Sequence, residues 1–231
     1  MKDWIVQLLT QLTAPYWTSS LSMEQFVTAM QETLHMVFFA LIFGGIWGFI
    51  QAIILYLTRP EGILPQRALH YGLNPIVNAL RSLPFIILLI AVIPLTKILV
   101  GTSIGTWAAI VPLTIYIGPY MGRLIETSLL EVNEGIVESA QAMGATPLQI
   151  IFKFVLPEAR SSVILNLTTA TISLIGATAM AGAVGAGGVG DLAISYGYQR
   201  FDSSVVVLTV IVLLILVQIV QMLGEWLSKL R

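Results

Sequence analysis

The sequence predicts an all-α integral membrane protein with five membrane-spanning helices. Apolar residues make up 57% of its 231 residues and charged residues only 10%, against about 45–50% and about 25% in an ordinary soluble domain. The mean hydropathy is +0.90, and a bilayer crossing needs about 20 mostly apolar residues. Five stretches meet this need, at residues 34–57, 76–100, 105–125, 163–184 and 204–226.

The segment before the first stretch, residues 1–24, is predicted to lie on the outer membrane surface. Its apolar residues recur at helical spacing, and Tyr16 and Trp17 suit the headgroup region. Polar residues interrupt the short apolar run and no cleavage site follows, which argues against a signal peptide. We therefore expect a short interfacial helix, followed by one transmembrane domain over residues 25–231.

Prolines interrupt the second and third stretches, at Pro84, Pro94, Pro112 and Pro119. Membrane helices tolerate proline where neighbouring helices or water satisfy the freed carbonyl groups, so we expect kinked helices around a cavity. In the first stretch, Gly44 and Gly48 form a G-x-x-x-G pattern that indicates close helix packing.

The distribution of Lys and Arg predicts which side of the membrane each terminus occupies. An odd number of crossings places the termini on opposite sides, and cytoplasmic loops carry the excess of positive charge. Arg81 lies within the second stretch, and the favoured interpretation is that its side chain extends to the inner boundary. An N-terminus outside the cell then puts eight basic residues inside (Arg59, Arg67, Arg81, Arg123, Lys153, Arg160, Lys229 and Arg231) and three outside (Lys2, Lys97 and Arg200).

This orientation gives two long connections, a cytoplasmic one at residues 126–160 and an outer one at residues 185–203. Long connections often carry function. In the first, Ile136, Val137 and Ala140 recur at helical spacing with Met143, which predicts a short amphipathic helix.

Residues typical of helix ends then predict a tight turn and a second helix in the cytoplasmic connection. Gly144 supplies the left-handed conformation that ends a helix. Thr146 and Gln149 form a capping-box pattern around Pro147 at the first helical position, and Leu156-Pro157 is expected to stop the helix. Its apolar side is predicted to consist of Leu148, Ile151, Phe152 and Val155.

Two interpretations of this helix-turn-helix remain open from its pattern. The two amphipathic helices would either lie on the inner membrane surface, or dock with Glu138 and their apolar residues into a groove of a cytoplasmic partner. Periodicity alone favours neither.

The order Glu138, Ala140, Gly144 and Leu156-Pro157 resembles the EAA loop of bacterial ABC importer permeases, with Ser139 in place of the usual first alanine. The resemblance implies a type I ABC importer fold in which this loop forms coupling helices that contact an ATP-binding subunit. The coupling residues that it implies are Glu138, Ala140, Met143, Gly144, Ala145, Thr146 and Pro147.

Four segments resemble methionine ABC transporter permeases in particular: residues 81–105, 108–115, 142–150 and 179–201. This resemblance implies a multi-pass subunit of the bacterial inner membrane that works as a homodimer with two ATP-binding subunits. It also implies an extracytoplasmic methionine-binding protein or lipoprotein that docks on the outer loop, and methionine as the substrate. ATP and magnesium would be bound by the partner, so we expect no cofactor, metal or catalytic residue in this chain.

A stripe of small and mildly polar residues in the fourth stretch is a candidate translocation path, formed by Asn166, Ser173, Ala177 and Met180. The resemblance places Met180 near the path, in its middle or at the outer gate, and Ala177 stands where the family often has tyrosine. The competing interpretation is helix packing, because small and hydroxylated residues commonly join membrane helices.

Two other classes of function compete with an ATP-driven importer. A secondary carrier or channel for a small amphipathic solute is disfavoured because no Asp, Glu or His occupies the centre of a later stretch. A membrane enzyme would need a clustered nucleophile, base or metal set, which the sequence does not display. No basic run suggests nucleic acid, and the chain has no cysteine.

Overall fold

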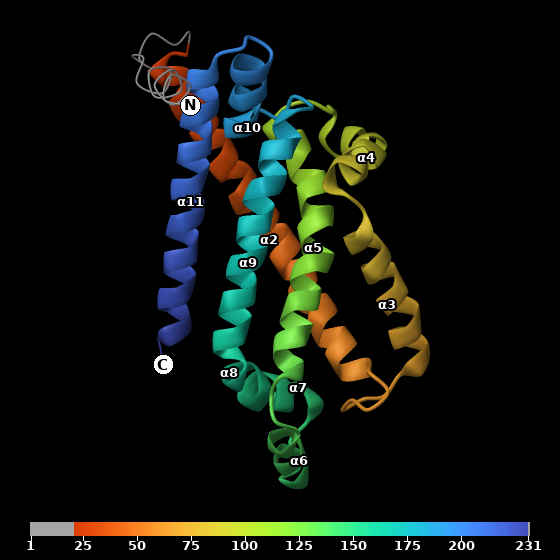
Figure 1. Ribbon diagram of the computed structural model, residues 1–231. Helices are drawn as coiled ribbons and strands as arrows, with labels where there is room; N and C mark the ends of the chain where they lie inside the picture. Colours follow the sequence, from red (N-terminus) through yellow and green to blue (C-terminus); the bar gives the residue numbers. More distant parts are fainter. Residues whose placement is uncertain (1–20, 231) are drawn as a thin grey trace, which may run out of the picture.

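The computed structural model describes residues 21–230, and these residues form helices joined by short connections, with no strand among them (Figure 1). Four helices are long and apolar enough to cross a membrane: α2 (Met23–Thr58), α5 (Thr106–Leu130), α9 (Arg160–Gly182) and α11 (Ser203–Lys229). The interfacial helix expected before them lies almost wholly outside the described residues.

Helix α2 starts eleven residues before the predicted first stretch. Ser22 caps it, because the Ser22 hydroxyl accepts a hydrogen bond from the Gln25 N–H and the Gln25 side chain accepts one from the Ser22 N–H. This reciprocal capping satisfies backbone N–H groups that would otherwise have no partner. Hydropathy missed this polar first turn, since it responds only to the apolar part of the helix.

The second predicted stretch, residues 76–100, is interrupted at Pro84, in line with the expected kink, and the helix before the bend begins nine residues earlier than the stretch. Helices α3 (Arg67–Ser82) and α4 (Phe85–Val100) meet at a bend of 111°. The backbone at Leu83 is extended, as is usual for a residue before proline, and Pro84 has no N–H to continue the helix. The pair counts as a fifth crossing only if both arms belong to one bent span.

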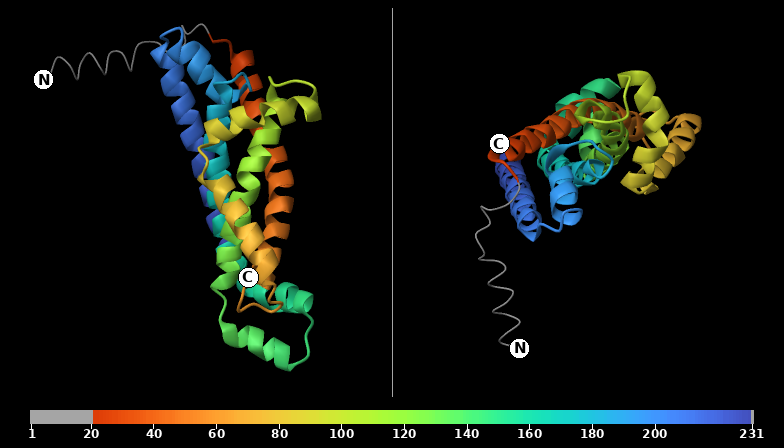
Figure 2. Two further views of the ribbon diagram at one scale, coloured as in Figure 1. Left: turned by 90° about the vertical axis from the view of Figure 1, so that its right-hand side faces the viewer. Right: turned by 90° about the horizontal axis from the view of Figure 1, so that it is seen from above.

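Helix α5 lies at the centre of the bundle. Seen from above, α11 lies on one side of it and α3 with α4 on the other (Figure 2). The described core joins α5 to α2, α4 and α9, and its fully buried members include Met36, Ala40, Leu113, Ile117, Ala170, Leu174 and Ala181. The prolines Pro94, Pro112 and Pro119 lie inside helices, as expected.

Short helical elements cover the two ends of the bundle. At one end lie α6 (Glu134–Ala142), α7 (Pro147–Ile150), the π-helix η2 (Ile151–Val155) and α8 (Leu156–Glu158). At the other end, α10 (Gly188–Leu192) and the π-helix η3 (Ala193–Tyr198) join α9 to α11 (Figure 1).

The second helix of this connection extends through η2 and α8 and ends at Glu158, one residue after Leu156-Pro157. A single turn residue, Ala159, separates it from α9. A proline inside a helix lacks an N–H and clashes with the carbonyl group four residues earlier. The wider π-turn of η2, in which the Leu156 N–H donates to the Ile151 carbonyl oxygen, directly precedes Pro157.

Candidate functional site

The turn between α6 and α7 has the geometry that the sequence predicts. Gly144 has a φ of +77°, in the left-handed region that favours glycine. The Thr146 hydroxyl accepts a hydrogen bond from the Gln149 N–H at 3.4 Å, and the Gln149 side chain accepts one from the Thr146 N–H at 3.0 Å. Pro147 occupies the first helical turn. Caps on both sides therefore give this turn a defined shape.

One face of the loop is buried against the protein's own bundle. Ala140 is fully buried, together with Ile150, Ile151 and Val155. They share a core with Tyr56 of α2 and with Ile125 and Leu129 of α5. Ala140 therefore joins the loop to the bundle and presents no surface to a partner in this conformation.

The predicted apolar faces of the two loop helices are only partly right. Met143, Leu148 and Phe152 were assigned to the same faces as the buried residues, but they are exposed. Met143 follows the last residue of α6, and Ile150 takes the expected place of Leu148 in the core. A helical period does not extend across a turn or a π-helix, because both change the angle between successive side chains.

The other face of the loop is open and carries mixed chemistry. Glu138, Gly144 and Thr146 are exposed, and the Met143 and Leu148 side chains are 68% and 59% exposed. Helix α6 lies beyond the ends of the long helices (Figure 1). The loop thus presents an exposed surface that is both apolar and acidic. Its buried apolar residues hold the loop against the bundle.

The structure places Asn166 and Ser173 of α9 against α5. The Asn166 amide donates to the Ser128 hydroxyl at 2.7 Å and to the Leu124 carbonyl oxygen at 3.3 Å. The Ser173 and Tyr116 hydroxyls lie 2.9 Å apart. Both residues therefore join two membrane helices, which is the packing alternative for the stripe.

The other two residues of the stripe differ in burial. Ala177 is buried in the central core, whereas Met180 is 54% exposed. Met180 lies two residues before the end of α9, at the end of the bundle that α10 covers. The four residues of the stripe do not form one open surface.

The glycine-rich segment at the α10 end of the bundle is closely packed. The Glu32 carboxylate of α2 accepts a hydrogen bond from the Gly188 N–H at 2.7 Å, and the Thr33 hydroxyl accepts one from the Val189 N–H at 2.9 Å. Two α2 side chains thus cap α10. A side chain on Gly190 would collide with the backbone of Ala179, so α10 lies directly against α9.

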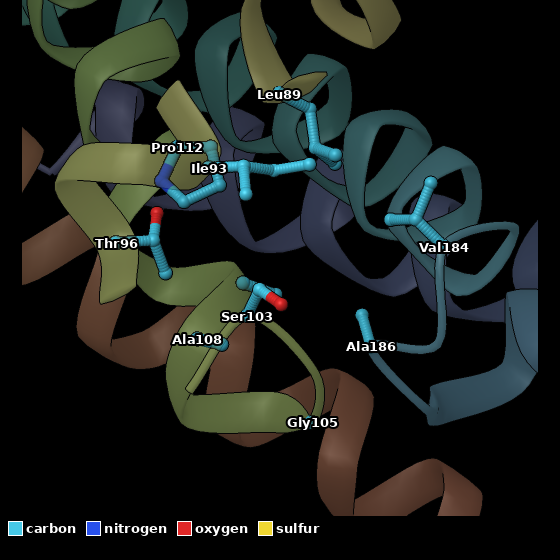
Figure 3. Close-up of a pocket in the computed structure, with 10 residues that line it drawn as sticks. Leu89, Ile93, Thr96, Ser103, Gly105, Ala108, Pro112, Val184 and Ala186 are labelled. Carbon is cyan, nitrogen blue, oxygen red and sulfur yellow. The ribbon is translucent and has the colours of Figure 1, made fainter. Parts of the chain in front are cut away.

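A small cavity lies at this end between α4, α5 and the segment after α9 (Figure 3). It has a volume of about 20 Å³, room for roughly one water molecule. Beside it, the Gly105 N–H donates to the Gly185 carbonyl oxygen at 2.9 Å. Its walls are mostly apolar: Leu89, Ile93, Thr96, Ser103, Gly105, Ala108, Ala109, Pro112, Val184 and Ala186.

Sequence reasoning missed a polar face on α3. His70, Asn74, Asn78 and Arg81 follow one another at spacings of four, four and three residues, which places them on one side of a helix. The guanidinium carbon of Arg81, which was expected to extend to the inner boundary, lies 5.9 Å from the centre of the Tyr120 ring, in the middle of α5. The spacing was the signal that could have revealed this face.

This all-helical fold, a bundle of apolar helices with short loop helices at one end, is that of ABC transporter permeases. The family of binding-protein-dependent transport system inner membrane components matches residues 44–230, and the chain belongs to this family.

Known proteins resemble the chain over most of its length. A probable D-methionine transport system permease protein, MetI, of Vibrio cholerae is 48% identical over 91% of this chain and 93% of its own. The D-methionine transport system permease protein MetI of Escherichia coli is 46% identical over 68% of this chain and 72% of its own.

Solved structures agree with these relatives. The fold matches a chain of the MetNI methionine ABC transporter in an inward-facing conformation, with a TM-score of 0.89 and 42% identity over 92% of this chain and 98% of that chain. An amino acid ABC transporter chain at 17% identity shares the fold, with a TM-score of 0.72.

Proposed function

We propose that the chain is the membrane-spanning subunit of an ATP-driven methionine importer. The observation that carries the proposal is the loop from α6 to α7, which exposes Glu138, Met143 and Leu148 on a capped turn at the end of the bundle. A rigid projection fits the helix-in-groove mode of binding. The likeness to methionine permeases at 48% and 46% identity supports the substrate.

In this proposal the ATP-binding subunit is a separate protein, present in two copies, and this chain forms a homodimer. The likeness to the MetNI methionine ABC transporter supports this assembly. ATP and magnesium then bind to the partner, and this chain supplies the path. An extracytoplasmic methionine-binding protein delivers substrate at the end covered by α10.

We propose five crossings, with α3 and α4 as the two arms of one, the N-terminus outside and the C-terminus in the cytoplasm. The excess of basic residues on the side of the loop supports this orientation. The path is then closed at its outer end in the described conformation. The Gly105–Gly185 hydrogen bond and the small volume of the cavity beside it support this inference.

The coupling residues are Glu138, Met143, Gly144, Thr146 and Leu148 on the exposed surface, with Ala140, Ala145 and Pro147 setting its shape. Movement of this surface by the partner would reach α9 through the helical residues 147–158 and the single turn residue Ala159. Because Ala140 and Ile150 lie in the core with α2 and α5, the loop also moves those helices.

The proposal is tested by co-purification with the candidate ATP-binding subunit and binding-protein-dependent uptake of labelled methionine into liposomes. Glu138→Lys and Leu148→Asp should abolish uptake and weaken co-purification while the chain still inserts. Glu61→Lys is the matched control, since Glu61 is exposed in the connection between α2 and α3. Normal uptake in both loop variants would contradict the coupling assignment, and uptake by the chain alone would favour a secondary carrier.

A further inference from the structure

The polar face of α3 reaches the middle of α5 at its Arg81 end. Arg81 lies beside Tyr120, the fifteenth of the 25 residues of α5. At 1.5 Å per residue, Tyr120 lies about 21 Å from one end of α5 and about 15 Å from the other. An arginine at that depth must face water or a polar partner, because the hydrocarbon region does not solvate its charge.

Two contacts show that this face points toward α5. The Arg123 guanidinium donates to the Asn74 side-chain oxygen at 3.4 Å, and the Arg81 guanidinium lies over the Tyr120 ring. Asn78, between Asn74 and Arg81 on the helix, is exposed. The polar face therefore lies against α5, and Asn78 within it is exposed.

The two arginines at this face differ in their counter-charges. Arg123 pairs with Glu126 at 2.9 Å, and this is the one ion pair between side chains in residues 21–230. The Arg81 Nε is buried and has no hydrogen-bond partner among the same residues. Arg81 is therefore a cation beside the middle of α5 that forms no ion pair with a carboxylate in the described residues.

Aromatic rings continue from Arg81 toward the outer end. The Tyr120 and Tyr116 rings are stacked with their centres 6.3 Å apart, and the Tyr116 and Phe85 rings meet at 5.2 Å. A thioether makes favourable contacts with aromatic rings. This arrangement therefore matches a ligand that has a carboxylate and a flexible apolar side chain. The carboxylate would lie beside the guanidinium and the side chain along the aromatic rings.

We propose that Arg81 binds the α-carboxylate of an amino-acid substrate during its passage, which rests on the proposed function and extends it to a site. A guanidinium pairs with a carboxylate through two parallel hydrogen bonds. Asn78, one turn earlier on the same face, offers its amide oxygen to the substrate's ammonium group. Tyr116, Tyr120 and Phe85 contact the side chain.

The first test uses the permease assembled with its ATP-binding subunit in proteoliposomes. Arg81→Gln should lower binding-protein-dependent uptake of labelled methionine by about 10-fold or more, the value of a lost charged hydrogen bond, while ATP hydrolysis stays within about twofold. Arg67→Gln is the matched control, since Arg67 is exposed at the other end of α3. Wild-type uptake by Arg81→Gln, or an equal fall in uptake and ATP hydrolysis, would overturn the inference.

The second test uses the wild-type complex, so it does not depend on the folding of a variant. Phenylglyoxal modifies accessible arginines, and mass spectrometry reports each site. Methionine should protect Arg81 and leave Arg67 unprotected, whereas methioninamide, which lacks the carboxylate, should protect neither. Equal modification of Arg81 with and without methionine would overturn the inference. Failure of the wild-type complex to import methionine would instead contradict the proposed function.

Discussion

The backbones of Gly48 on α2 and Gly118 on α5 are in direct contact. A Cβ atom on Gly48 would lie 2.6 Å from the Gly118 carbonyl oxygen and 2.8 Å from the Gly122 N–H nitrogen. Close approach through glycine is a common way for membrane helices to associate. The G-x-x-x-G pattern of Gly44 and Gly48 is therefore used within one chain, which confirms its prediction as a packing element.

Gly48→Ala should destabilise the bundle. The added methyl group meets backbone atoms that cannot move aside, so we expect a cost of about 1–3 kcal/mol in the free energy of unfolding. Thermal unfolding of the purified protein in detergent measures it. Gly45→Ala is the control, because a Cβ atom there meets only the flexible end of Met121 at 3.6 Å, and an equal loss in both variants would contradict the contact.

Substitutions at Gly144 test whether its backbone conformation matters, because the space around it is not restricted. No atom lies within 4 Å of a Cβ atom built there, yet its φ is +77°, which costs a side-chain-bearing residue about 1–2 kcal/mol. We expect Gly144→Val to lower ATP-driven uptake strongly and Gly144→Asn, which tolerates this conformation better, to lower it much less. Equal effects would show that the turn's shape is not what the partner needs.

Asn166→Leu should loosen α9 from α5. The substitution removes the hydrogen bonds to Ser128 and Leu124, and such a bond in a membrane bundle is worth about 0.6–1.7 kcal/mol. Unfolding in mixed detergent measures the loss. Thr169→Val is the control, since the exposed Thr169 hydroxyl bonds only within α9, to Leu165; a comparable loss there would contradict an inter-helix role for Asn166.

Thr33→Val should loosen the α10 end of the bundle locally. The Val189 N–H is buried and donates to the Thr33 hydroxyl, and an unpaired buried N–H costs about 1–3 kcal/mol. Hydrogen exchange over α10 should therefore accelerate. In Thr28→Val, where the lost bond lies within α2, exchange over α10 should stay at the wild-type rate, and unchanged exchange in both variants would refute the capping of α10 by α2.

The sequence was sufficient to predict those elements that depend on a single local property. Helices α5, α9 and α11 follow from continuous apolar runs, and the turn at Gly144 follows from its capping residues. The polar first turn of α2 and the amphipathic α3 were missed or cut short, because hydropathy identifies contact with lipid and these segments have other surroundings.

The site residues were harder to predict because a side chain's neighbours come from other helices. From the sequence, Asn166 was predicted to line the translocation path and Arg81 to extend to the inner membrane boundary. In the structure, Asn166 bonds to Ser128 and Arg81 lies over Tyr120. Both partners lie on α5, about 40 residues away along the chain. The periodicity of residues within one helix cannot predict which residues of another helix they contact.

The π-helix η2 sets which side chains of the loop face the bundle. A π-turn holds one residue more than an α-turn, and one residue corresponds to about 100° of rotation around a helix axis. Deleting a single residue from Ile151–Val155 would therefore turn Leu156–Glu158 by about that angle against Pro147–Ile150. The rotation ends there, because the turn residue Ala159 separates these elements from α9. The residue count of five positions thus decides which loop side chains lie in the core and which stay open.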